Sequence, residues 1–82
     1  MDAQIGMIVR SAAGREKGRF MVIVSMEKGF VYLADGKERK LASPKKKNEK
    51  HICLTKTVIN TDNLTDKRLR DLLREYTEQS IS

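Results

Sequence analysis

The chain has 82 residues, of which 39% are hydrophobic and 34% charged, and its formal net charge is +6. A chain of this length buries only about 60–65% of its unfolded surface, which provides one core and excludes two. The apolar content argues against disorder, and a single cysteine excludes an intramolecular disulfide. No window approaches the roughly 18 apolar residues of a membrane span, and the N-terminus lacks a signal-peptide pattern, so we expect a cytoplasmic protein.

Most of the net charge lies in one segment, residues 37–50. Seven basic residues stand there against two acidic ones, a local excess of +5 out of the total of +6. Each phosphate that such a cluster neutralises releases counterions, which adds affinity that does not depend on sequence. The charge distribution therefore predicts a polyanion as the partner.

Three segments rich in apolar and β-branched residues predict strands. They are residues 5–9, 19–26 and 30–34. Residues 10–18, with two glycines and no apolar period, predict a turn, and residues 27–29 a short hairpin connection. Asp35 and Gly36 then fit a type I′ turn, in which both central residues have positive φ. The pattern is that of an antiparallel meander.

Two further strands are predicted. A brief one is expected at residues 39–41, ended by Ser43 and Pro44, after which residues 45–50 are expected to form a loop. The alternation in residues 51–57 predicts the last strand. Five short strands favour a small β-barrel, which removes free strand edges.

The C-terminal segment changes to a helical period. Its apolar stripe consists of Leu69, Leu72, Leu73 and Tyr76. A helix is predicted over residues 66–76, with Thr65 as N-cap and Leu64 packed on Leu69 as a hydrophobic staple. Residues 78–82 are expected to fray. The stripe is expected to cover the barrel of the same chain, the alternative being another molecule. Residues 1–60 and 61–82 would then form a single domain.

Few residues offer catalytic chemistry. His51 and Cys53 supply only two of the four ligands of a zinc site, and Cys53 lies in an apolar run where we expect it to be buried. The segment from Gly14 to Gly18 lacks the P-loop signature. The acidic residues near the turns are expected to be solvated; these are Glu16, Glu27, Asp35 and Glu49. We therefore predict no enzyme, no cofactor and no metal.

A second basic cluster surrounds the first turn. It consists of Arg10, Arg15, Lys17 and Arg19. Loops at one end of a small barrel lie close together, so this cluster and the segment 37–50 are expected to share one face. Phe30 and Tyr32 are candidates either for stacking on an unpaired base or for the core.

Two segments of the sequence resemble the corresponding segments of a known protein family. Residues 6–23, GMIVRSAAGREKGRFMVI, resemble a KOW motif, and residues 32–51, YLADGKERKLASPKKKNEKH, resemble its continuation in KOW-type large-subunit ribosomal proteins of archaea and eukaryotes and their small bacterial relatives. The likeness covers about residues 4–57. It implies an SH3-like β-barrel that binds RNA, commonly ribosomal RNA, with Gly14 as the turn glycine. It implies neither catalysis nor a cofactor.

The sequence thus predicts an RNA-binding module, monomeric when free, that serves as a ribosomal protein or as a ribosome-associated factor in translation. Phosphate contacts would position it without reading sequence. The predicted RNA-binding residues are Arg10, Ser11, Gly14, Arg15, Lys17, Arg19, Lys37, Arg39, Lys40, Lys45, Lys46, Lys47, Asn48 and Lys50. The alternative is a protein-interaction module of the transcription or translation machinery, as in KOW-bearing elongation factors, which would contact RNA polymerase or a ribosomal protein.

Overall fold

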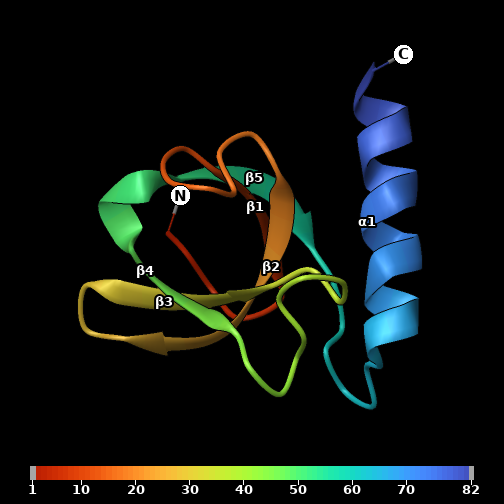
Figure 1. The fold of residues 1–82 in the computed structure, drawn as a ribbon, viewed down its shortest axis with the longest axis horizontal. Helices are drawn as coiled ribbons and strands as arrows, with labels where there is room; N and C mark the ends of the chain where they lie inside the picture. Colours follow the sequence, from red (N-terminus) through yellow and green to blue (C-terminus); the bar gives the residue numbers. More distant parts are fainter. Residues whose placement is uncertain (1, 82) are drawn as a thin grey trace.

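Five antiparallel strands form one sheet in a computed structural model, which describes residues 2–81 and the side chains as far as residue 79 (Figure 1). The elements are β1 (Met7–Ser11), β2 (Phe20–Glu27), β3 (Phe30–Ala34), β4 (Lys45–Asn48), the 3-10 helix η1 (Glu49–His51), β5 (Ile52–Val58) and α1 (Asp66–Ile81). The strand order is β4-β3-β2-β1-β5, which places β4 and β5 at the two edges. Among the described residues, no helix is long and apolar enough to cross a membrane.

The sheet is strongly curled. Its two edge strands are consecutive in the chain and are joined only by η1. In a flat sheet, four spacings of about 4.8 Å would separate them by about 19 Å, whereas three residues of 3-10 helix rise only about 6 Å. The N–H of Glu49 donates to Gly29 O (3.1 Å) and the N–H of Ala12 donates to His51 O (2.8 Å), which ties η1 to the connection between β2 and β3 and to the residue that follows β1. Within the described residues no ladder joins β4 to β5, so the sheet remains open there.

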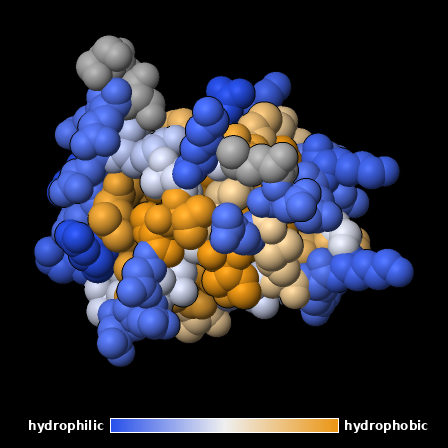
Figure 2. All heavy atoms as spheres, turned by 180° about the vertical axis from the view of Figure 1, so that it is seen from behind, coloured by the Kyte–Doolittle hydropathy of each residue, from blue (hydrophilic) through white to orange (hydrophobic). Residues whose placement is uncertain are grey.

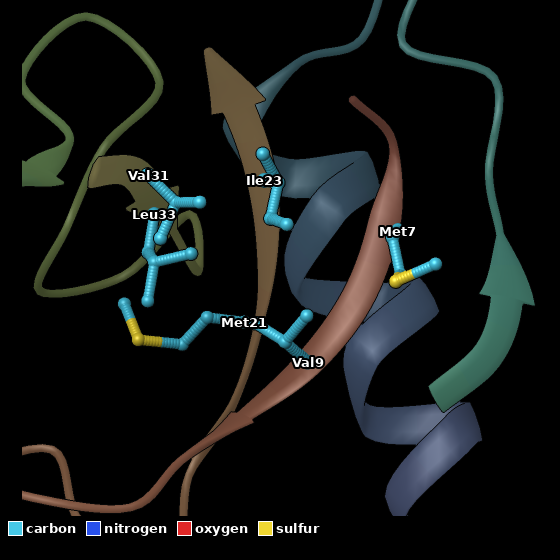
Figure 3. Close-up of a cluster of buried hydrophobic side chains, with 6 residues drawn as sticks. All are labelled: Met7, Val9, Met21, Ile23, Val31 and Leu33. Carbon is cyan, nitrogen blue, oxygen red and sulfur yellow. The ribbon is translucent and has the colours of Figure 1, made fainter. Parts of the chain in front are cut away.

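The curled sheet has an apolar cluster on each face because successive side chains of a strand point to opposite sides. The inner cluster consists of Met7, Val9, Met21, Ile23, Val31 and Leu33, which converge from β1, β2 and β3 (Figure 3). The outer cluster consists of Ile8, Val22 and Ala34 with Leu69 and Leu73 of α1. The helix therefore covers its own sheet, as expected, and Leu64 packs against the same cluster.

The strands predicted from apolar alternation are present, with shifts at their ends. The third strand has the predicted bounds, and β2 and β5 each lie one residue further along the chain. The first strand is Met7–Ser11 rather than residues 5–9, because Gly6 adopts φ +90° and leaves Ile5 half-exposed outside the ladder. Cys53 is exposed, and the prediction that it is buried was wrong. It pairs with Arg10 on the outer face of β1 and β5, whereas Ile52 packs on the inner cluster.

The segment after β3 differs most from the predictions. No strand forms at residues 39–41, and the predicted loop at 45–50 contains β4 and η1 instead. Asp35 does not have positive φ, so the turn is not of type I′, although Gly36 adopts φ +79°. The Asp35 carboxylate instead accepts hydrogen bonds from the N–H groups of Lys37 (2.9 Å) and Arg39 (2.9 Å), which shapes a longer loop.

The helix begins where predicted and ends later. Thr65 Oγ1 accepts a hydrogen bond from the N–H of Arg68 (3.1 Å), which confirms the N-cap. The helix continues to Ile81, so residues 78–81 are helical rather than frayed, and Ser82 lies outside the described residues. Tyr76 packs edge-on against Phe20, with ring centroids 5.1 Å apart, and this contact anchors the last turns to the sheet.

Candidate nucleic-acid interface

The connection between β1 and β2, residues 12–19, is called the first turn. Gly14 and Gly18 both adopt positive φ, at +81° and +88°. Backbone hydrogen bonds from the N–H of Ser11 to Arg19 O (2.9 Å) and from the N–H of Gly18 to Ser11 O (2.7 Å) close its base. In this tight turn Arg15 and Lys17 are exposed, while the residue between them, Glu16, is buried. The turn therefore presents cations outward around one inward carboxylate.

Glu16 is the centre of a buried polar network and is only 4% exposed. Its Oε1 accepts hydrogen bonds from Nε (3.0 Å) and Nη2 (2.9 Å) of Arg39, and its Oε2 lies 3.7 Å from Nζ of Lys47. Lys47 Nζ also donates to Ser11 Oγ (2.7 Å) and to Ala13 O (2.6 Å). The prediction that Glu16 is solvated was therefore wrong.

The network shifts the ionisation of Glu16. Burial by itself raises the pKa of this carboxyl, because it disfavours the charged form. Hydrogen bonds from Arg39 and from the backbone N–H of Glu16, together with the charges of Arg39 and Lys47, outweigh burial and hold the pKa below its usual range. Glu16 is therefore ionised at neutral pH.

The same network joins the first turn to the connection between β3 and β4, residues 35–44, which is called the second loop. Arg39 of the second loop reaches Glu16 of the first turn. Nη1 of Arg19 lies 3.1 Å from Oε2 of Glu38 and 3.9 Å from Oδ2 of Asp35. The two basic segments are therefore in direct contact, which a shared face requires.

Several of the predicted RNA-binding residues serve the fold. Lys47 and Ser11 are buried and bonded to each other, so neither can reach an external polyanion, and for these two the prediction was wrong. Lys46 lies 3.5 Å from the Glu27 carboxylate and 4.5 Å above the ring of Phe30. Arg39 is paired with Glu16, as described above.

Of the remaining cations in the predicted set, all but Lys45 are exposed. Six of them make no ion pair with any described residue; these are Arg10, Arg15, Lys17, Lys37, Lys40 and Lys50. Gly14 is exposed, and Lys45 and Asn48 are half-buried. The Asn48 side chain accepts a hydrogen bond from the N–H of Lys50 (2.9 Å) and so caps η1.

Phe30 and Tyr32 belong to neither apolar cluster. Both are half-buried and alternate along β3 with Val31 and Leu33, which face the inner cluster, so they lie on the opposite face of the sheet. A hydrogen bond to Glu27 raises the pKa of the Tyr32 phenol. The core interpretation of these two rings was therefore wrong.

Among the described residues, no three His, Cys, Asp or Glu side chains gather to hold a metal ion. Neither a protein-family model nor a curated protein matches this chain. The residue that sequence reasoning missed is Glu16. Its only signal was an acid between two basic residues and two glycines in a tight turn, a pattern that does not distinguish a solvated carboxylate from a buried one.

Proposed function

We propose that the protein binds RNA, with ribosomal RNA the leading target, through phosphate contacts at the face shared by the first turn and the second loop. One observation carries the proposal. Glu16 holds the two segments together, and the six cations of the predicted set that are exposed and make no ion pair with a described residue lie on these segments or next to them. Four other exposed cations without such an ion pair, Lys28, Lys56, Arg68 and Arg70, lie elsewhere in the chain. Arg15 and Lys17 belong to the first turn and Lys37 and Lys40 to the second loop. Arg10 lies on β1 just before the first turn, and Lys50 lies in η1, which bonds to Ala12.

Such a surface suits a nucleic-acid backbone. Unpaired lysine and arginine side chains keep their full charge for phosphates, and contacts of this kind position a protein without reading sequence. The curled sheet supports the SH3-like barrel of the KOW resemblance, because one 3-10 turn joins its edge strands. We propose that the protein is a ribosomal or ribosome-associated RNA-binding module.

The test is the salt dependence of RNA binding. Fluorescence anisotropy with a labelled RNA hairpin gives the slope of log K against log salt, and each of Lys17→Ala, Lys37→Ala and Lys40→Ala should lower that slope by about 0.7–0.9. Lys56→Ala is the matched control, since Lys56 is equally exposed and unpaired but lies on β5. If the triple variant binds the hairpin with the wild-type affinity and slope, the assignment of this face is wrong.

A second candidate function, a protein-interaction module, is favoured by a different surface. Ile5, Leu54 and Val58 are 53%, 37% and 46% exposed. Figure 2 shows apolar surface across the middle of the face that lies behind Figure 1. Val58 pairs with Met7, at the end of β1 that lies away from the first turn. Exposed apolar side chains that form a continuous patch commonly mark a protein contact.

Sedimentation of cell lysate separates the two functions. Association with ribosomal particles through RNA should be lost after ribonuclease treatment and in the Lys17, Lys37 and Lys40 triple variant. Association through the apolar surface should survive ribonuclease and be lost in the Val58→Ser variant.

A further inference from the structure

A groove opens between α1 and the sheet, beside the face proposed to bind RNA. Its volume is about 850 Å³, which falls in the range of small-molecule sites and accommodates a nucleotide. Apolar side chains and cations line it together; those that the argument uses are Phe20, Leu73, Arg19, Lys37, Arg70 and Arg74. Gly18 and Arg19 belong to the first turn and Lys37 to the second loop, so the groove continues the proposed interface.

Phe20 gives the groove an aromatic wall. The residue is half-buried, and its ring is held by Tyr76 in an edge-to-face contact with an interplanar angle of 73°. A fixed aromatic ring at the side of an open groove is the arrangement on which unpaired bases stack. Leu73, which is buried in the outer cluster and 6% exposed, borders the groove from the helix side.

The charge of the groove favours a phosphate. Lys37 makes no ion pair with a described residue, and Nη1 of Arg70 donates to the neutral carbonyl of Gly36 (2.7 Å) and keeps its full charge. Three acids line the groove, of which two are already engaged and the third, Glu78, is exposed. Asp71 is paired with Lys67 and Arg74, and Asp35 accepts two backbone hydrogen bonds.

We propose that one unpaired nucleotide of the bound RNA enters this groove, with its base against Phe20 and its phosphate near Lys37 and Arg70. This inference rests on the proposed RNA binding. Its consequence is a preference for RNA that carries a bulge or an open loop, because a fully paired helix presents no free base. Stacking on one aromatic ring strengthens binding about tenfold or more.

Two labelled RNA duplexes that differ only by one bulged 2-aminopurine nucleotide test the inference. The wild-type protein should bind the bulged duplex about tenfold more tightly, with quenching of the 2-aminopurine fluorescence on stacking. Phe20→Leu should remove both the preference and the quenching and leave affinity for the paired duplex unchanged. Phe20→Tyr should retain both effects.

Because Phe20 also contacts Tyr76, its leucine variant is compared with the wild type by thermal unfolding. Thr77→Phe is a second variant, which narrows the groove from the helix side and should also remove the preference. Equal, salt-dependent binding of both duplexes by the wild type would overturn the groove assignment and leave the proposed function intact. Binding of neither duplex would overturn both.

Discussion

Replacing Glu16 with Gln tests the central structural claim, that a buried carboxylate holds the two basic segments together. The variant leaves the Lys47 ammonium, whose side chain is only 7% exposed, without its acidic partner. Removing one partner of a buried ion pair costs about 3–5 kcal/mol. Lys47 keeps its hydrogen bonds to Ser11 and Ala13, and Arg39 can turn toward solvent, so we expect the lower end, about 3 kcal/mol.

Thermal unfolding followed by circular dichroism measures this loss. For a domain of this size, each kcal/mol lowers the midpoint temperature by about 4–8 °C, so Glu16→Gln should unfold about 12–24 °C below the wild type. Urea denaturation gives the same difference as a free energy of unfolding. A loss below about 1 kcal/mol would refute the reasoning, because a carboxylate that is free to leave the network would have no such effect.

A double-mutant cycle measures the interaction energy between Glu16 and Lys47 apart from their interactions with other residues. Lys47→Met removes the buried ammonium and keeps most of the apolar stem. Replacing both members of a buried pair is often close to neutral, so the double variant should be more stable than the sum of the single losses implies, by about 1–3 kcal/mol. Simple additivity would mean that Glu16 and Lys47 do not interact.

Three further outcomes are expected. Because the pKa of Glu16 is lowered in the folded protein, its stabilising effect is complete above the unfolded pKa of a glutamate, about 4.3, and is lost as the pH falls through the folded pKa. The free energies of unfolding of the wild type and Glu16→Gln, measured by urea denaturation, should therefore converge at low pH. Gly36→Ala should cost more than the roughly 1–2 kcal/mol of a positive φ, because its Cβ would collide with the carbonyl oxygen of Asp66; Gly29→Ala, with the same φ and open space, should cost only that amount. Iodoacetamide should modify Cys53 in the folded protein nearly as fast as in urea, and protection of the thiol would contradict its exposure.

The elements that could be predicted are those whose local pattern and tertiary role agree. Residues 30–34 form a strand both in the prediction and in the structure, because Val31 and Leu33 fill the inner cluster at the two-residue period that a strand requires. The helix start was equally clear, since the Thr65 hydroxyl satisfies a backbone N–H that would otherwise lack a partner. The helix continues past Tyr76, whose ring contacts Phe20 far away in the sequence, and no local pattern marks its end at Ile81.

The errors share a cause in tertiary context. Lys45–Asn48 has poor strand propensity, and it becomes a strand because β3 supplies its hydrogen bonds and Glu16 stabilises Lys47 on the inner face. Cys53 was expected to be buried because its neighbours in the sequence are apolar, but successive residues of a strand point to opposite faces, and Cys53 lies on the exposed face opposite to Ile52. The pairing of β1 with β5 contains a shift in register, which no pattern in the sequence of either strand predicts.

The pairing of cations sets a limit on the proposed interface. The predicted set contained eleven lysines and arginines, which as phosphate contacts would give a salt slope of about −8 to −10. Only six of them are exposed and make no ion pair with a described residue, and they would give about −4 to −5. A measured slope of about −4 to −5 means that Arg19, Arg39 and Lys46 remain paired with their acidic partners when RNA binds. A slope of about −6 to −8 corresponds to nine contacts and means that RNA displaces those carboxylates, so the first turn and second loop would have to rearrange on binding.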